Sequence, residues 1–486
     1  MDWLTKRASL SRDKIALIDI ESEKNLTYKV LNEHVNRWRI ILLSKGIDKG
    51  DCVAAIAQNQ VELIEIMFAC GKIGAIFVPL NWRLSIYELK YIIDDCSPKI
   101  LLYNEKFVEQ VQDLNVNHAY SLSLFHHQND KDDFCSKEID DEDPWLIIYT
   151  GGTTGKPKGV VLTHQSINWN ALNTIISWGL TGEETTLTYM PLFHTGGINA
   201  LSLPILLNGG TVVIGNHFEA KEALYYLKKY KCTIALFVPT MYHMMQQTEE
   251  FEKLEFPEMK VFLSGGAPCP LSIYQHFAKK GLPFKEGYGL TEAGPNNFFI
   301  TPKEASIKKG SIGRPMIFND IKLLKLNGEE AKASEVGEIL IKGKHSFKEY
   351  WNNPAVTAET LIAGWIYTGD LAIMDDDGYY YIVGRKNDMI ISGGENVYPL
   401  EIEQWLCEHS QIDEAAVIGV SDEKWGEKVT AFITLTNNHL LTEEGLKAYC
   451  LTKLAAYKVP KSFIILKELP KTHVGKIDKK SLKSLL

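Results

Sequence analysis

The sequence predicts an α/β protein with a large N-terminal domain, made of α/β subdomains and a small β-barrel-like subdomain, and a small α+β C-terminal domain. Up to about residue 310, segments with helical periodicity alternate with short apolar runs typical of buried strands. After that point, short strand patterns separated by turn residues indicate a small β-structure. From Arg385 onward, a strand, a Gly-Gly turn and a helix follow in succession, as in a small α+β unit.

The individual elements follow from the apolar pattern. Helices are expected where apolar residues recur with the helical period, at residues 26–47, 61–75 and 220–230. Strands are expected at short apolar runs that end in small or turn residues: 51–58, 76–80, 99–104, 145–150, 211–215, 233–240 and 260–268. In open α/β sheets, ligands bind beyond the carboxyl ends of the strands. We therefore expect the glycine-rich segments 149–159, 264–268 and 287–294 to share one crevice.

Composition excludes several classes of protein. The 486 residues are 45% apolar and 23% charged, an ordinary globular balance, and the net charge of −9 disfavours nucleic acid as a partner. The eight cysteines include no C-x-x-C pair or zinc spacing, so we expect reduced thiols. Neither a signal peptide nor an apolar run of about 20 residues is found, which predicts a cytoplasmic protein without a membrane span.

The segment Tyr149–Gly159, "YTGGTTGKPKG", has the composition of a phosphate-binding loop. Its glycines permit close backbone approach, its threonines offer hydroxyl donors, and Lys158 offers a positive charge. A Walker loop does not fit, because Thr150 stands where its first glycine belongs and Pro157 follows Lys156 in place of Ser or Thr. Pro157 also disfavours a helix directly after the loop. The alternative is a surface hairpin without a ligand.

Six segments, taken in order, resemble the motifs of the adenylate-forming (AMP-binding, ANL superfamily) enzymes, which include acyl- and aryl-CoA ligases, luciferases and the adenylation domains of peptide synthetases. They are Tyr149–Gly159, Ser264–Pro268, Gly287–Pro295, Gly364–Asp370, Gly384–Glu403 and Pro470–Lys479. Two positions depart from the usual pattern. Gly151 stands where serine is common, and Asn387 stands at the hinge position, where aspartate or lysine is usual.

The resemblance implies an ATP- and Mg²⁺-dependent site. Tyr288 would stack on adenine, Asp370 would accept both ribose hydroxyls, and Glu292 with Thr150 would hold the metal. The other residues implied in ATP or AMP binding are Gly151, Gly152, Thr153, Thr154, Gly155, Lys158, Gly265, Gly266, Ala267, Gly287, Gly289, Thr291 and Arg385.

The resemblance also implies two half-reactions. A carboxylate attacks the α-phosphorus of ATP and releases pyrophosphate, and coenzyme A then displaces AMP to give a thioester. Lys476 would enter the crevice during the first step, which requires a mobile C-terminal domain. The expected domains are residues 1–386 and 387–486, with the hinge near Asn387. Ser392, Gly393 and Gly394 would line the coenzyme A tunnel, because a Gly-Gly pair leaves room for a thin pantetheine arm.

One position in the sequence gives most of the information about the carboxylic acid substrate. Adenylation domains for amino acids commonly carry an aspartate where this chain has His194, and an imidazole cannot pair with an α-ammonium group. We therefore expect an acid that lacks an α-amino group, aryl or medium- to long-chain acyl, with His194 in a catalytic role. The expected acyl pocket is Trp169, Asn173, Phe237, Met241, Pro295 and Asn296.

Alternatives to a carboxylic acid–CoA ligase remain at this stage. One is a stand-alone adenylating enzyme that loads a carrier protein, another is an o-succinylbenzoate-type CoA ligase, and a third is a non-catalytic nucleotide-binding module. The segment "TEAGPNN" argues against the second of these without excluding it. The expected partner is a small carboxylic acid, joined by a carrier protein in the carrier-loading alternative, and the expected oligomeric state is a monomer or homodimer.

Overall fold

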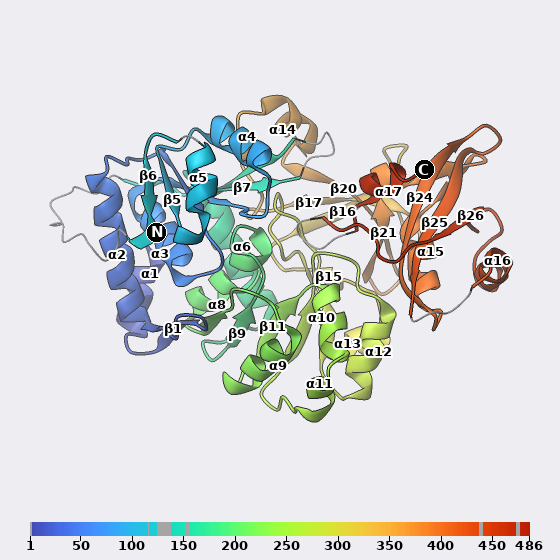
Figure 1. Ribbon diagram of the computed structural model, residues 1–486, viewed down its shortest axis with the longest axis horizontal. Helices are drawn as coiled ribbons and strands as arrows, with labels where there is room; N and C mark the ends of the chain where they lie inside the picture. Colours follow the sequence, from blue (N-terminus) through green and yellow to red (C-terminus); the bar gives the residue numbers. More distant parts are fainter. Residues whose placement is uncertain (1, 115, 124–137, 152–155, 437–440, 473–476) are drawn as a thin grey trace.

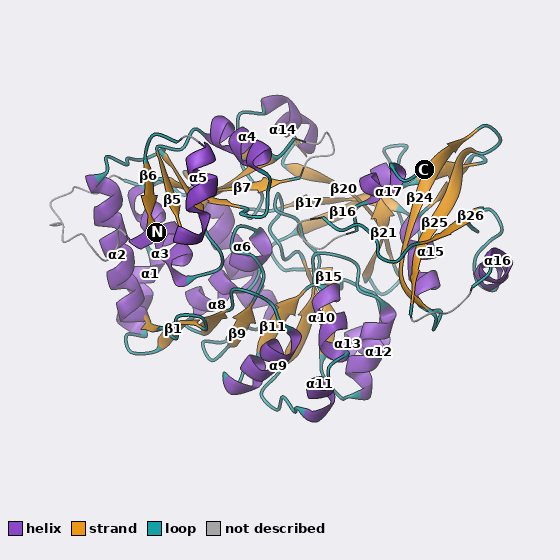
Figure 2. Cartoon of the chain, in the orientation of Figure 1, coloured by secondary structure: helices purple, strands orange, loops and turns teal. Residues whose placement is uncertain are grey.

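The computed structural model describes residues 2–114, 116–123, 138–151, 156–436, 441–472 and 477–486 (Figure 1). Helices and strands alternate along most of the chain, and the last ~100 residues form a separate unit at the far end of the molecule from the N-terminus (Figures 1 and 2). The large N-terminal and small C-terminal parts match the α/β architecture that the sequence predicts.

The first seven-stranded sheet is parallel except for one edge. Its order is β13-β12-β11-β9-β10-β1-β2, and only the pair β1–β2 is antiparallel. The strands are β1 (Ile15–Asp19), β2 (Asn25–Thr27), β9 (Thr185–Thr188), β10 (Thr211–Ile214), β11 (Ile234–Phe237), β12 (Val261–Ser264) and β13 (Phe284–Glu286).

The second seven-stranded sheet has the order β18-β8-β7-β4-β3-β5-β6. The strands are β3 (Cys52–Ile56), β4 (Ile76–Leu80), β5 (Ile100–Tyr103), β6 (Ala119–Ser121), β7 (Pro144–Thr150), β8 (Lys158–Thr163) and β18 (Glu349–Tyr350). Strands β7 and β8 pair antiparallel, with Thr150 opposite Lys158. The glycine-rich loop therefore joins two strands and does not start a helix, which confirms that it is not a Walker loop.

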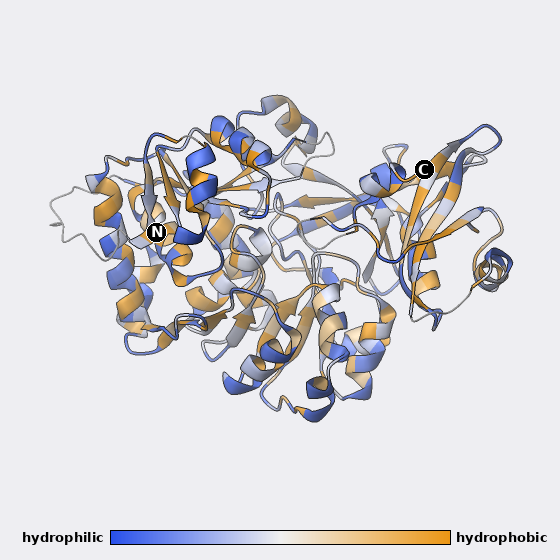
Figure 3. Cartoon of the chain, in the orientation of Figure 1, coloured by the Kyte–Doolittle hydropathy of each residue, from blue (hydrophilic) through white to orange (hydrophobic). Residues whose placement is uncertain are grey.

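Helices cover both faces of the two sheets, because the strands are apolar on both sides. In β12, for example, Val261 and Leu263 pack into one core and Phe262 packs into another. Three cores result: one between the two sheets, one outside the first sheet and one outside the second. Figure 3 shows the apolar strands inside and polar helix faces outside.

The helices of this region are α1 (Trp3–Leu10), α2 (Tyr28–Ser44), α3 (Val61–Ile73), α4 (Ile86–Cys96), α5 (Val108–Leu114), α6 (His164–Trp178), α7 (Thr195–Ile198), α8 (Ser202–Asn208), α9 (Ala220–Lys229), α10 (Pro239–Gln246), α11 (Glu249–Lys253), α12 (Leu271–Lys279), α13 (Pro302–Ile307) and α14 (Pro354–Thr360).

The predicted small β-subdomain is an antiparallel sheet of order β16-β17-β20-β19, with β21 also paired to β20. This strand order is open, so the pairing does not by itself make a closed barrel. The strands are β16 (Asp320–Leu324), β17 (Gly337–Lys342), β19 (Leu361–Ile362), β20 (Trp365–Met374) and β21 (Tyr380–Arg385), and a short pair, β14 (Phe298–Phe299) and β15 (Arg314–Pro315), precedes them.

The C-terminal unit has a five-stranded sheet of its own, in the order β23-β22-β25-β24 with β26 beside β25. The strands are β22 (Ile390–Ser392), β23 (Glu395–Val397), β24 (Ile412–Asp422), β25 (Gly426–Leu435) and β26 (Ser462–Ile465), and the helices are α15 (Pro399–Cys407), α16 (Glu443–Leu451) and α17 (Lys479–Lys483). The Gly-Gly turn joins β22 to β23 before α15 begins. The predicted order of strand, turn and helix therefore omitted one strand.

Candidate active site

Asp370, in the middle of β20, is the centre of a three-residue cluster. Its Oδ2 accepts a hydrogen bond from the Tyr288 hydroxyl at 2.7 Å, and its Oδ1 accepts one from Arg385 Nε at 2.9 Å. Asp370 and Arg385 lie directly opposite each other in the β20–β21 pair, so the ion pair follows from strand register. The Asp370 charge raises the pKa of Arg385. The structure thus brings together three residues predicted to contact adenosine.

The two loops predicted to hold adenine leave neighbouring strands. β12 and β13 are parallel, and Ser264 lies opposite Glu286, so Gly265 and Gly287 start their loops side by side. Gly266 has φ +83°, a conformation that glycine adopts without strain. A Cβ at Gly289 would lie 2.2 Å from the Pro295 carbonyl carbon, so this glycine is required by the close return of its own loop.

The phosphate end of the site is built around Tyr350, a residue that the sequence did not single out. Its hydroxyl donates a hydrogen bond to Glu292 Oε1 at 2.7 Å, and Lys158 Nζ lies 4.8 Å from the centre of its ring. Tyr350 is in β18, which pairs with β8, the strand that begins at Lys158. Tyr350 therefore connects the glycine-rich loop to the loop that carries Glu292. Gly152, Thr153, Thr154 and Gly155 lie outside the described residues.

The residues present fit a phosphate-bound magnesium ion. Within the described ranges, no group of three or more His, Cys, Asp or Glu side chains could hold a metal without help. Mg²⁺ at nucleotide sites is typically bound by one or two carboxylates together with phosphate oxygens. Glu292, which Tyr350 connects to Lys158, supplies such a carboxylate, and the assignment of Glu292 and Thr150 as metal ligands remains a prediction.

His194 has a local structural role in addition to any catalytic one. It is the N-cap of α7, and its Nδ1 accepts a hydrogen bond from the Gly196 backbone N–H at 3.2 Å. An accepting Nδ1 carries no proton, so in the neutral ring the proton is on Nε2. The sequence prediction that an imidazole replaces an acidic counter-ion here is consistent with this neutral tautomer.

The side-chain amides of two predicted acyl-pocket residues form hydrogen bonds with other parts of the protein. Asn173 is buried, its Nδ2 donates to Asn319, and its Oδ1 accepts from Ser177 and the Phe318 N–H. The Asn296 Nδ2, also buried, donates to the Thr174 hydroxyl and the Ala200 carbonyl. These contacts give both amides a structural role within the protein, and their place in the acyl pocket remains a prediction.

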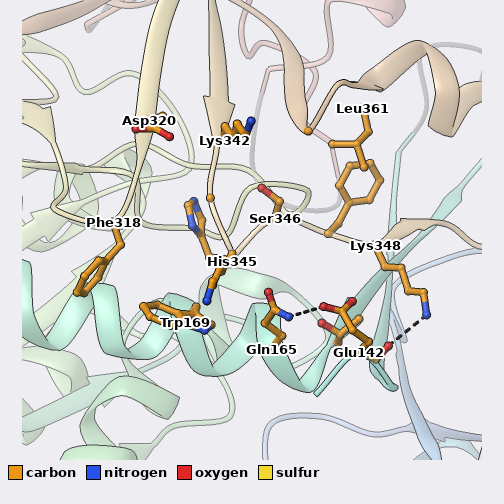
Figure 4. A pocket seen from close by; sticks show the side chains of 15 residues that line it. Glu142, Gln165, Trp169, Phe318, Asp320, Lys342, His345, Ser346, Lys348 and Leu361 are labelled. Atoms are coloured by element: carbon orange, nitrogen blue, oxygen red, sulfur yellow. Dashed lines mark hydrogen bonds between the residues drawn. The ribbon is translucent and has the colours of Figure 1, made fainter. Parts of the chain in front are cut away.

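The remaining acyl-pocket residues lie in two places. Phe237 is fully buried in the core outside the first sheet, and Met241 and Pro295 are partly buried. Trp169 instead lines a cavity of about 560 Å³ between α6, the β16–β17 strands and residues 343–348 (Figure 4). There its ring meets Phe318 edge-to-face at 5.3 Å, and Lys344 Nζ lies 4.8 Å from the ring centre. Phe237 and Met241 are not among the residues that line this cavity, and the shared acyl pocket remains a prediction.

The predicted coenzyme A segment forms an exposed hairpin tip. Gly393 and Gly394 have φ +62° and +84°, the left-handed values of a two-residue turn between β22 and β23. The Gly393 N–H donates to the Trp425 carbonyl at 2.8 Å, and the Ser392 Oγ is buried without a hydrogen-bond partner among the described residues. Lys476, the predicted catalytic lysine, lies outside the described residues. Its neighbours Lys471 and Ile477 form an antiparallel bridge in the C-terminal unit.

Comparisons with known proteins agree with this geometry. The family model of the AMP-binding enzymes matches residues 4–351, and that of the AMP-binding enzyme C-terminal domain matches residues 401–476. Feruloyl-CoA synthase from Amycolatopsis is 36% identical, with 98% of this chain and 96% of that protein aligned. 2-Succinylbenzoate–CoA ligase from Geobacillus kaustophilus is 33% identical, with 100% of this chain and 98% of that protein aligned.

Solved structures give the same result. o-Succinylbenzoate CoA synthetase from Bacillus subtilis, in complex with its acyl-adenylate intermediate, superposes with a TM-score of 0.91 at 30% identity, covering 99% of this chain and 98% of that one. The same enzyme has been solved with ATP and magnesium, with a TM-score of 0.90 at 30% identity and 99% of both chains covered. No helix within the described ranges is long and apolar enough to cross a membrane. The chain belongs to the AMP-binding enzyme family and, within it, to the acyl- and aryl-CoA ligases, which use ATP, Mg²⁺ and coenzyme A.

Proposed function

We propose that this ligase adenylates an aromatic carboxylic acid without an α-amino group and transfers the acyl group to coenzyme A. The observation that carries the proposal is His194, an imidazole whose Nδ1 accepts a hydrogen bond from the Gly196 N–H, where amino-acid-activating domains commonly carry a carboxylate. Two relatives support the aromatic class. One is named feruloyl-CoA synthase, and the other, 33% identical over the whole chain, is named indoleacetate–CoA ligase of Aromatoleum aromaticum.

In the first half-reaction the crevice residues position ATP. Each carboxylate oxygen of Asp370 has about two lone-pair sites, and only one on each is used by Tyr288 and Arg385. The carboxylate can therefore also accept the two ribose hydroxyls. Tyr288 presents its ring to adenine between Gly287 and Gly289.

At the other end of ATP, Lys158 and the threonines of the glycine-rich loop stabilise the leaving pyrophosphate. Glu292, with Thr150, would hold Mg²⁺. The bound metal would neutralise charge on the phosphates. The Tyr350 hydroxyl orients the Glu292 carboxylate by its 2.7 Å hydrogen bond.

The second half-reaction is assigned to the C-terminal part. We propose a domain division at residues 1–386 and 387–486, with Asn387 in the hinge. Asn387 lies in a short 3₁₀ turn, Lys386–Asp388, directly after β21. Lys476 would contact the attacking carboxylate and the α-phosphate during adenylation, and the Ser392–Gly394 hairpin would then line the path of coenzyme A.

A screen of acids tests the proposal. Pyrophosphate release is measured with ferulate, indoleacetate, 2-succinylbenzoate, a long-chain fatty acid and an α-amino acid, each followed by thioester formation with free coenzyme A. We expect an aromatic acid to give the highest kcat/KM and the α-amino acid to give no turnover. The o-succinylbenzoate alternative is favoured by two 33% identical relatives named 2-succinylbenzoate–CoA ligase. This alternative replaces the proposal if only 2-succinylbenzoate reacts. Acyl transfer to a carrier protein but not to coenzyme A would contradict the proposal.

We also propose that the enzyme is cytoplasmic and acts as a monomer or homodimer on a small-molecule acid. The seven cysteines in the described part of the chain are unpaired thiols, six of them buried, as expected for a reducing compartment. Fractionation and light scattering test these two statements.

A further inference from the structure

Asn297 closes the loop that carries Tyr288 and Glu292. Its backbone N–H donates to the Tyr288 carbonyl at 3.1 Å, and its side-chain Nδ2 donates to the Gly294 carbonyl at 2.8 Å. The residue is 0% exposed. Tyr288 and Gly294 are therefore both tied to one buried residue, the first through its backbone N–H and the second through its side chain.

The same amide is anchored from outside the loop. Asn297 Oδ1 accepts hydrogen bonds at 3.0 Å from His345 Nε2 and from Asn319 Nδ2, and Asn319 Nδ2 also lies 2.9 Å from the Asn297 carbonyl. All three side chains are buried. Because a buried amide that loses a partner pays the full cost of desolvation, this cluster tolerates little displacement.

His345 is suited to act as a permanent donor. Burial lowers its pKa to about 4, so the ring is neutral at physiological pH, and the facing amide oxygen places the proton on Nε2. Gly343 makes room for the ring, because a Cβ there would lie 2.2 Å from His345 Cε1. The ring is thus held between the Gly343 backbone and the Asn297 amide.

Two sets of hydrogen bonds join the same two parts of the protein. The loop after β13 is linked to the sheet of β16, β17 and β20 by Tyr288–Asp370 on the crevice side. Asn297 makes a second link to the same sheet, because Asn319 directly precedes β16 and His345 follows β17. Since both links join one loop to one sheet, they act on the same spacing.

We propose that Asn297 is a positioning residue for nucleotide binding, which sets the geometry of Tyr288 and Asp370 through its hydrogen bonds to His345 and Asn319. The inference rests on the proposed function, since Tyr288 and Asp370 are taken to bind adenosine. It assigns to this chain a support for the nucleotide site that lies outside the crevice.

The test compares Asn297→Ala with Asn208→Ala in the full-length enzyme. Asn208 is a matched control, because its Nδ2 also donates to a backbone carbonyl, that of Leu180 at 2.7 Å, away from the crevice. We expect Asn297→Ala to raise the Kd of AMP and the KM of ATP about tenfold, with kcat at saturating ATP reduced less than threefold. Asn208→Ala should lower Tm without changing either constant. Equal Kd values for AMP in Asn297→Ala and the wild type would overturn the inference.

A second pair keeps the test valid if Asn297→Ala folds poorly. His345→Gln retains an N–H donor for Asn297 Oδ1, whereas His345→Leu removes it. We expect near-normal AMP affinity in His345→Gln and a loss of about tenfold in His345→Leu, because only the second variant leaves the amide oxygen short of a donor. Equal affinities in the two variants would contradict the inference. Failure of the wild type to bind AMP would instead contradict the proposed function.

Discussion

The crevice of the N-terminal part and the hairpin of the C-terminal part differ in how far they are already assembled. In the crevice, Asp370 is buried and already bonded to Tyr288 and Arg385, which come from a different loop and strand. At the hairpin, Gly393 and Gly394 are exposed, and the Gly393 N–H donates to the carbonyl of Trp425 in the same unit. The difference indicates that the proposed nucleotide-binding groups are preassembled in one part, whereas the groups proposed for thiol transfer lie on another.

The two parts meet where α15 lies against β21 and at an ion pair. His243 of α10 and Asp413 of β24 form an ion pair at 3.3 Å, in which both side chains are more than a third exposed. Exposed pairs of this kind contribute at most about 1 kcal/mol. Such an ion pair would add little resistance to the rotation that the proposed hinge at Asn387 requires.

Removing the Asp370 carboxylate should have the largest effect, because it disrupts the assembled region at its centre. We expect Asp370→Ala to lower acid-dependent pyrophosphate release by about 10²- to 10³-fold, since the ribose loses its acceptor and Arg385 loses its partner. The measurement is a pyrophosphate-release assay with a saturating acid. Asp377→Ala, an exposed carboxylate that pairs with Lys308, is the control and should stay within twofold of the wild type. Activity in Asp370→Ala above a tenth of the wild type would contradict the assignment.

Replacing Lys476 tests whether the C-terminal part acts on the crevice. We expect Lys476→Ala to reduce adenylation by about 10²-fold or more, because the ammonium that stabilises the developing charge is absent. Thioester formation from supplied acyl-adenylate should be spared. Lys483→Ala, an exposed lysine of α17, is the matched control. A comparable loss in both half-reactions would refute a lysine delivered only for the first.

The sequence predicts the plan of the fold well because its signals are local. Apolar runs such as residues 145–150 become the expected strands, and Pro157 correctly indicates that no helix follows the glycine-rich loop. The site is predicted where a motif carries it, as for Asp370 and Arg385, which the β20–β21 register brings opposite each other.

The parts of the site that the sequence does not predict depend on contacts between residues far apart in the chain. Tyr350 and His345 lie about 50 residues or more from the residues they bind, Glu292 and Asn297, and no spacing rule connects them. Asn173 and Asn296 were expected to contact the acid because asparagine is a good hydrogen-bond donor and acceptor. Residue type alone does not say whether those bonds are already made within the protein, and here they are.

The buried histidines of the N-terminal part predict a pH dependence of stability. Burial lowers the pKa of His164 and His345 to about 4, below the value of about 6.5 expected in the unfolded chain. The unfolded chain therefore binds protons first as the pH falls, so stability is complete above about pH 6.5 and is lost toward pH 4. At pH 5 the free energy of unfolding is lower by about 2 kcal/mol for each histidine, and urea unfolding at pH 7.5 and 5.0 measures this difference. His345→Gln should remove the part of this pH dependence that His345 contributes. If the free energy of unfolding falls as much between pH 7.5 and 5.0 in that variant as in the wild type, the assignment is contradicted.

Gly151 should give the smallest effect. Among the described residues, no atom lies within 4 Å of a Cβ at this position, so Gly151→Ser adds a hydroxyl without a clash with them. We expect the KM of ATP to fall by about two- to fivefold if that hydroxyl reaches the phosphates. An unchanged KM would show that Thr150, Thr153, Thr154 and Lys158 suffice.

The division of labour between the two regions is tested most directly by Gly394→Asn, with Gly378→Asn as its control. Both glycines have left-handed φ values, +84° and +79°, and open space around the missing Cβ, and asparagine tolerates this conformation. Only Gly394 lies on the proposed path of coenzyme A. The measurement is acid-dependent ATP–pyrophosphate exchange and thioester formation in the same preparations. The account predicts that Gly394→Asn keeps normal exchange but loses thioester formation by at least about tenfold, while Gly378→Asn keeps both. An equal loss of both activities in Gly394→Asn, or no loss of thioester formation, would contradict it.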